Sequence, residues 1–267
     1  MEKGALLGKG MTAEVFKWGS DKVLKLFFER YGEERILYEA KIGDIVHQAV
    51  EPSPAVFDVI DVDGRKGILF QRVNGKTMSK QIEAKPWKLY CFAKQLAGLH
   101  FKIHECSAEL LPSQKERLTF VIGRSSQRLG DKGKRILEYL ESLPDGFSVC
   151  HGDLHFNNVI VSGKALVAVD WNSAYRGNPL GDVARTCLMM NSPVVNPGTP
   201  TEMVRLIQYI KWLTYLTYIN EYMRLSKVKL ESIEEWILPI AAAKLKDNPA
   251  KEEEWLMDII NKRLLQL

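Results

Sequence analysis

The segment His151-Gly152-Asp153-Leu154-His155-Phe156-Asn157-Asn158, followed later by Val169-Asp170-Trp171, decides the fold that we assign to this chain. Between these two segments, the apolar run Val159-Ile160-Val161 and a second run that begins at Ala165 flank Ser162-Gly163-Lys164. Apolar residues that favour strands, on both sides of a turn that contains glycine, predict a tight β-hairpin. Such a hairpin would return the second segment to the end of the first.

Three polar side chains in these segments have the chemistry that phosphoryl transfer needs. A carboxylate at Asp153 can accept the proton of a substrate hydroxyl. Mg²⁺ takes few protein ligands, all of them oxygen, so the amide of Asn158 and the carboxylate of Asp170 are a suitable pair. The spacing therefore predicts one site with a base and two metal ligands. The alternative is a surface turn rich in Asp and Asn that matches by chance.

The pattern H-G-D-x-x-x-x-N followed by D-W resembles that of the aminoglycoside phosphotransferase and choline kinase family, small-molecule kinases with a protein-kinase-like fold. The resemblance implies that Asp153 is the catalytic base, that His151 supports its loop, and that Asn158 and Asp170 hold Mg²⁺. It also implies an α+β, bilobal fold. An N-terminal antiparallel five-stranded sheet with one helix would bind the nucleotide, and a mainly helical C-terminal lobe would carry the catalytic-loop hairpin. We expect these lobes to be residues 1–73 and 74–267.

A kinase should begin with a glycine-rich loop, and the segment Gly8-Lys9-Gly10-Met11-Thr12-Ala13-Glu14-Val15 fits one. Glycine allows positive φ and lets backbone N–H groups approach phosphate oxygens closely. Protein kinases have a third glycine where this chain has Ala13, which is a smaller departure for the small-molecule family. An ordinary hairpin turn is the alternative. We expect the nucleotide contacts of this loop to come from Gly8, Gly10, Thr12 and Val15.

The apolar segment from Asp21 to Phe28 is predicted to be a buried strand, and it contains Lys25. An unpaired ammonium is costly to bury, so this lysine should have an acidic partner. Helical periodicity follows from Glu33 onward. By resemblance, Glu39 in that helix pairs with Lys25, which would bridge the α- and β-phosphates. Glu33 and Glu34 are rival partners, and in a further alternative the lysine extends to solvent.

Two further strands are predicted around Val62-Asp63-Gly64-Arg65, because an Asp-Gly step between alternating apolar runs is a strong hairpin signal. Five strands and one helix thus precede Asn74. By resemblance, the segment from Gln71 to Val73 is the hinge whose backbone groups bind the adenine edge. The same resemblance puts apolar side chains above and below the adenine ring, namely Leu7, Val15, Val23 and Ile160.

The C-terminal two thirds of the chain has mainly helical patterns. In the amphipathic helix from Trp87 to Glu105, His100 and His104 are spaced i, i+4, which suits metal ligands. No third ligand follows them in the sequence, so histidines that pack and cap helices are the favoured interpretation. Further on, Asp182 can cap a helix start, and by resemblance it ties that helix to the backbone of the catalytic loop.

The acceptor is the part of the function that the sequence leaves open. The aromatic residues between Trp212 and Tyr222 could bind a quaternary ammonium, as choline kinases do by resemblance, although such a stripe is more often core. An aminoglycoside would need acids, and those between Glu231 and Asp258 have the pattern of helix-surface charge. Eleven residues separate Asp170 from Asp182, too few for the activation segment of a protein kinase.

Composition and charge agree with a cytoplasmic enzyme. The 267 residues are 46% hydrophobic, without an apolar run of transmembrane length or an N-terminal secretory segment, so no membrane partner is expected. A net charge of +4 without an aromatic stacking series does not mark a nucleic-acid binder. The sequence does not distinguish a monomer from a dimer. Scattered cysteines predict reduced thiols and neither a zinc site nor a disulfide framework: Cys91, Cys106, Cys150 and Cys187.

The sequence thus predicts an ATP-dependent, Mg²⁺-requiring small-molecule kinase, with GTP as an alternative donor. It would transfer the γ-phosphoryl group directly to a hydroxyl of an aminoglycoside, a choline-like or homoserine-like compound, or a related alcohol. The alternative is a nucleotide-binding regulator or pseudokinase without transfer activity. Such a protein would more often have lost one of four polar side chains that are all present here: Lys25, Asp153, Asn158 and Asp170.

Overall fold

The computed structural model describes residues 3–195, 198–245 and 250–267, which form two compact units. The first unit contains the chain up to Lys80 together with Phe156–Ala174, and the second contains Gln81–His155 and Tyr175–Leu267. The segment after the catalytic loop therefore packs with the N-terminal residues, although it lies in the middle of the sequence. The functional division after Val73 stays a prediction.

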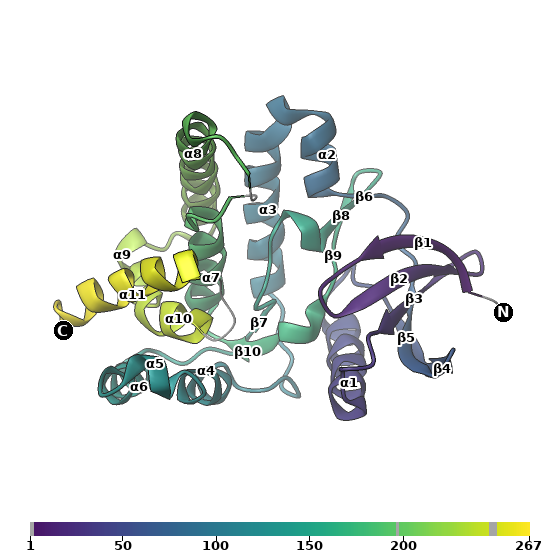
Figure 1. Cartoon of the computed structure of the whole chain (residues 1–267), viewed down its shortest axis with the longest axis horizontal. Helices are drawn as coiled ribbons and strands as arrows, with labels where there is room; N and C mark the ends of the chain where they lie inside the picture. Colours follow the sequence, from purple (N-terminus) through teal and green to yellow (C-terminus); the bar gives the residue numbers. More distant parts are fainter. Residues whose placement is uncertain (1–2, 196–197, 246–249) are drawn as a thin grey trace. The chain divides into compact units, whose positions relative to one another are not determined.

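The first unit is built on an antiparallel sheet in the order β1-β2-β3-β5-β4 (Figure 1). Helix α1 (Glu33–Ala49) packs on this sheet, where Ile36 of the helix meets Phe27 and Ile68 of the strands in one apolar core. The predicted five strands and one helix are confirmed. The strands are β1 (Lys3–Lys9), β2 (Ala13–Trp18), β3 (Lys22–Phe27), β4 (Val56–Val62) and β5 (Arg65–Gln71).

A smaller sheet in the same unit contains the hairpin predicted after the catalytic loop. Strands β8 (Val159–Ser162) and β9 (Ala165–Ala168) pair around Gly163, whose φ of 61° is one that glycine adopts readily, and β6 (Lys76–Thr77) pairs with β8. The backbone N–H of Val169 donates to the carbonyl of Asn158 at 2.9 Å. The hairpin thus returns the chain to the end of the preceding short helix, η2 (Phe156–Asn158), as the sequence predicted.

The second unit is mainly helical, as predicted, with one pair of short strands, β7 (Ser148–Cys150) and β10 (Tyr175–Gly177). Helix α8 packs along α3 and also contacts α7 (Figure 1). Helix α2 (Met78–Ala84) begins in the first unit and ends in the second. None of the helices in the described ranges is long and apolar enough to cross a membrane. The other helices are η1 (Pro86–Lys88), α3 (Leu89–His104), α4 (Gln114–Gly123), α5 (Ser126–Leu129), α6 (Lys132–Ser142), α7 (Pro179–Asn191), α8 (Thr201–Ser226), α9 (Leu230–Glu234), α10 (Ile237–Lys244) and α11 (Ala250–Leu264).

Candidate active site

Lys25 is the centre of a polar cluster in the first unit. Its Nζ lies 2.6 Å from Oε1 of Glu39 on α1 and 2.9 Å from Oδ1 of Asp170, which follows β9. The lysine side chain is 13% exposed and that of Glu39 10%. The predicted pair is therefore formed, while the rival Glu33 binds Lys66 instead. A buried ammonium with two carboxylate partners meets the requirement for paired charge.

The two carboxylates decide the charge of this cluster. Burial alone would lower the pKa of Lys25, but the charges of Asp170 and Glu39 outweigh it and raise the pKa above its ordinary value. The lysine is thus a cation throughout the neutral range. Burial raises the pKa of Glu39, although its ion pair with Lys25 acts in the opposite direction.

Asp170 and Asn158 are the two residues predicted to hold magnesium, and both lie in the first unit. Asp170 adopts a left-handed backbone conformation with φ of 65°, and its side chain is 42% exposed. Lys25 and the amide of Asn172 both donate to the same oxygen, Oδ1. Asn158 is buried and precedes β8 at the same open end of the hairpin, where its carbonyl accepts the backbone N–H of Val169. One accessible carboxylate with a neighbouring amide fits a metal that keeps water and phosphate as its other ligands.

The glycine-rich segment forms the turn between β1 and β2. Gly8 pairs with Val15 in the strand register, and the backbone N–H of Gly10 donates to the carbonyl of Ala13 at 2.9 Å. Neither glycine has a positive φ, so the conformational reason that we expected for them is wrong. A Cβ on Gly8 would meet nothing within 4 Å, and one on Gly10 only the Ala13 carbonyl, at 3.6 Å. These glycines therefore leave open space beside the backbone.

The other residues predicted to bind the nucleotide also lie in the first unit. Val15 on β2 is directly opposite Lys25 on β3, and Thr12 precedes β2. Gln71 ends β5, where its side chain accepts a hydrogen bond from the backbone N–H of Ala55. Val23 lies opposite Phe70 in the sheet, Val73 follows Arg72, and Ile160 lies on β8. Their contacts with a nucleotide stay predictions.

Asp153 lies in the second unit, in the loop that follows β7. Its Oδ1 accepts a hydrogen bond from Arg185 of α7 at 3.0 Å, and His155 Nε2 lies 3.6 Å from its Oδ2. Burial would raise the pKa of Asp153, but the hydrogen bond from His155 and the charge of Arg185 outweigh it and hold the pKa well below the ordinary value. The carboxylate is therefore ionised at neutral pH. The sequence interpretation missed Arg185, although its position one helical turn after Asp182 could have suggested a shared face.

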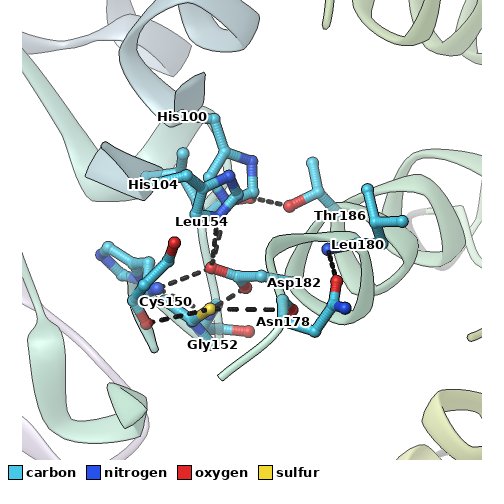
Figure 2. A network of polar contacts seen from close by, with 12 residues as sticks. His100, His104, Cys150, Gly152, Leu154, Asn178, Leu180, Asp182 and Thr186 are labelled. Carbon is cyan, nitrogen blue, oxygen red and sulfur yellow. Dashed lines mark hydrogen bonds and ion pairs between the residues drawn. The ribbon is translucent and has the colours of Figure 1, made fainter. Parts of the chain in front are cut away.

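Asp182 holds the backbone of the catalytic loop, as Figure 2 shows. This fully buried carboxylate accepts the backbone N–H of His151 at 2.6 Å and that of Gly152 at 2.9 Å. Gly152 has a φ of 75°, which explains a glycine at this position. The tie to the loop is confirmed, whereas the capping role is wrong: the N-cap of α7 is Asn178, whose side chain accepts the N–H of Leu180. His151, which is also fully buried, accepts the backbone N–H of Asp153 at 3.3 Å through its Nδ1 atom.

Three solved structures are among those to which this chain is similar in fold. An aminoglycoside-3'-phosphotransferase of type VIII has a TM-score of 0.59 and 18% identity, with 91% of each chain covered. An amicoumacin kinase in complex with AMP-PNP and Ca²⁺ has a TM-score of 0.56 and 13% identity, over 97% of this chain and 87% of that one. A choline kinase from Cryptosporidium parvum Iowa II has a TM-score of 0.53 and 12% identity, over 98% of this chain and 88% of that one. These identities are too low to show more than the fold.

The assignment to a family rests on the amino-acid sequence. Among curated proteins, none matches this chain in sequence. The model of the phosphotransferase enzyme family matches residues 4–214, which is most of the chain and includes the residues discussed above. The chain therefore belongs to the phosphotransferase enzyme family and is a small-molecule kinase with an α+β, kinase-like fold.

Proposed function

We propose that this kinase transfers the γ-phosphoryl group of ATP to a hydroxyl of a small molecule with the help of Mg²⁺, and that GTP is the alternative donor. The observation that carries the proposal is the cluster of Lys25, Glu39 and Asp170. It combines a cation suited to phosphate oxygens with a carboxylate suited to a metal, in a chain whose family transfers phosphoryl groups.

In the first unit, we assign the donor side of the reaction. Lys25 would bind the α- and β-phosphates, with Glu39 holding its ammonium in place, and Asn158 and Asp170 would hold Mg²⁺. The metal would neutralise charge on the phosphate oxygens during transfer. Open space beside Gly8 suits close approach of backbone N–H groups to phosphate. The remaining nucleotide contacts would come from Gly10, Thr12, Val15, Val23, Gln71, Val73 and Ile160.

In the second unit, we assign the acceptor side of the reaction. Asp153 would accept a hydrogen bond from the acceptor hydroxyl, and its low pKa makes it a group that orients the hydroxyl more than one that stores a proton. Arg185 supports this role because it holds Oδ1 of the carboxylate, while His155 faces Oδ2. His151 would support the loop from within the core. In one in-line step without a phosphoenzyme, the hydroxyl oxygen would bond to the γ-phosphorus while the bond from that phosphorus to the leaving ADP breaks. The hydroxyl proton would pass to Asp153 and from there to solvent.

The acceptor would be an aminoglycoside, a choline-like or homoserine-like compound, or a related alcohol, and we infer that the protein acts in the cytoplasm. The test is ADP release with Mg·ATP and Mg·GTP across a panel of aminoglycosides, choline, homoserine, thiamine and sugar alcohols. Turnover that depends on one acceptor class supports the proposal. Intact Mg·ATP binding without acceptor-dependent turnover would instead favour a regulator or pseudokinase, and phosphorylation of protein alone would favour a protein kinase.

A further inference from the structure

Asp182 is a fully buried carboxylate on which four hydrogen-bond donors converge. Two are the backbone N–H groups of His151 and Gly152. The other two are imidazoles, because Nε2 of His100 lies 3.0 Å and Nε2 of His104 3.4 Å from the same Oδ2 atom (Figure 2). Three of these donors face Oδ2 and one, the N–H of Gly152, faces Oδ1, and together they can offset the cost of burying the charge.

Each imidazole also has a partner on its other nitrogen. The hydroxyl of Tyr218 lies 2.6 Å from Nδ1 of His100, and that of Tyr222 lies 2.7 Å from Nδ1 of His104. The two histidines are one turn apart on α3 and the two tyrosines one turn apart on α8, the helix that packs along it. All four side chains are buried, and the imidazole centroids are 4.2 Å apart. The same Tyr–His pair is therefore built twice against one carboxylate.

The charges of the groups fix where the protons lie. Burial disfavours the charged form of Asp182, but the charge and hydrogen bond of His100 outweigh it and hold the pKa well below its ordinary value. The carboxylate therefore accepts, and each Nε2 atom that faces it carries a hydrogen. Burial and the neighbouring His100 lower the pKa of His104 to about 4, so this imidazole is neutral at pH 7 and its Nδ1 accepts. Burial raises the pKa of Tyr222, so its hydroxyl stays protonated and donates a hydrogen bond to Nδ1 of His104.

We propose that Tyr218, Tyr222, His100 and His104 are positioning residues for phosphoryl transfer. Each Tyr–His pair would hold Asp182 in the one orientation in which it binds the loop backbone at two successive N–H groups. Asp153 is the next residue of that loop. A rotation of Asp182 would therefore release the backbone that fixes the orientation of the Asp153 carboxylate. The inference rests on the function proposed for Asp153, and none of the four side chains touches the substrate in it.

A bound metal is the competing explanation, because the ligand atoms of His100, His104 and Asp182 lie within 4.8 Å of one another. Hydrogen bonding accounts for the geometry better. Structural zinc takes four protein ligands, and in the ranges that the structure describes this group offers three. A metal would also require the Nε2 atoms to lose the hydrogens that they direct at a buried anion.

The test compares Tyr218→Phe, Tyr222→Phe and the double variant with Tyr90→Phe, an exposed tyrosine on α3 that serves as a control. Phenylalanine keeps the ring and removes only the hydroxyl. We expect the double variant to lose roughly tenfold in kcat, the usual scale for one or two lost hydrogen bonds, with both KM values within about twofold of the parent. A structural role alone would lower the melting temperature and leave kcat per folded molecule unchanged.

A second readout does not depend on activity. Amide hydrogen exchange at His151 and Gly152 should become faster in the double variant and stay unchanged in Tyr90→Phe. If the parent transfers no phosphate, the proposed function fails, while this measurement still tests whether the Tyr–His pairs hold the loop backbone through Asp182. Unchanged exchange at both amides would overturn the inference, and so would stoichiometric zinc in the purified parent protein. Asp182→Asn does not serve this purpose, because it removes the negative charge that all four hydrogen-bond donors face and would disturb the whole cluster at once.

Discussion

Lys25 donates a hydrogen bond to Asp170 at 2.9 Å, across 145 residues of sequence. In the function that we propose, the lysine binds phosphate and the carboxylate binds Mg²⁺. Their ion pair compensates both charges while nucleotide and metal are not bound. Glu39 is the permanent partner, since it is buried beside the same ammonium. The cluster therefore links the stability of the first unit to nucleotide binding, and variants of its members should affect both.

Removing the cation should destabilise the protein. Lys25→Met leaves Glu39 buried without its counter-ion, and breaking a mostly buried pair typically costs about 3 kcal/mol. We expect the free energy of unfolding to fall by about this amount and nucleotide affinity to fall with it. Lys17→Met, which removes an exposed lysine on the neighbouring strand, is the control. Full stability in Lys25→Met would show that Glu39 does not depend on this partner.

Asp170→Ala should act on metal-dependent binding. The variant keeps the pair of Lys25 and Glu39 but loses the carboxylate assigned to Mg²⁺, so affinity for Mg·ATP should fall roughly tenfold or more. Titrating the nucleotide with and without Mg²⁺ measures this change. Asp44→Ala, an exposed acid on α1, should leave both affinities unchanged. An unaltered effect of Mg²⁺ in Asp170→Ala would reject the assigned role.

Gly8→Ala separates a binding role of the glycine from a structural one. The new Cβ would meet nothing within 4 Å and no positive φ is needed, so stability should be unchanged or about 0.5 kcal/mol higher. Nucleotide affinity should fall, because the methyl group occupies space assigned to phosphate. Gly67→Ala is the opposite case, since its Cβ would lie 2.6 Å from Leu24 Cδ1, and it should lose stability. Unchanged affinity in Gly8→Ala would place the phosphates elsewhere.

Asp153→Asn should lose turnover and keep nucleotide binding. The amide cannot accept a hydrogen bond with the strength of a carboxylate, and such groups contribute roughly 10²-fold or more to rate. The pKa of Asp153 lies well below its ordinary value, so its charge is lost only at pH values below about 4, the usual range of a free Asp. We therefore expect no decline of kcat from this group between neutral pH and that limit. Near-normal ADP release by the variant would contradict the assignment.

The sequence predicts most of the first unit because its signals are local. Alternating apolar residues around Asp63-Gly64 and around Gly163 specify hairpins, and an ammonium in an apolar strand requires a partner such as Glu39. The reason for the glycines at Gly8 and Gly10 was not predictable, because a turn that needs positive φ and one that needs open space have the same composition.

The second unit is less predictable because its polar contacts join residues that are distant in sequence. Arg185 meets Asp153 across 32 residues, and His100 meets Tyr218 across 118. Neither contact leaves a periodic trace, and the spacing of His100 and His104 suits core packing, metal binding and hydrogen bonding equally well. These interpretations are distinguished by the contacts in the structure: both histidines of α3 lie between Asp182 of α7 and the two tyrosines of α8.

His104 should make stability depend on pH in a defined direction. Its folded-state pKa of about 4 lies below the value of about 6.5 expected in the unfolded chain. Between these values the unfolded chain binds a proton that the folded chain does not, so the free energy of unfolding falls as the pH decreases through this window and this contribution levels off below it. The full effect is about 3 kcal/mol. His104→Gln removes the titrating group, so the free energy of unfolding, measured with urea across this window, should depend less steeply on pH than in the parent. An equal slope in the parent and in His104→Gln would show that this imidazole is protonated in the folded protein, which would also remove the proton arrangement on which its bond to Tyr222 depends.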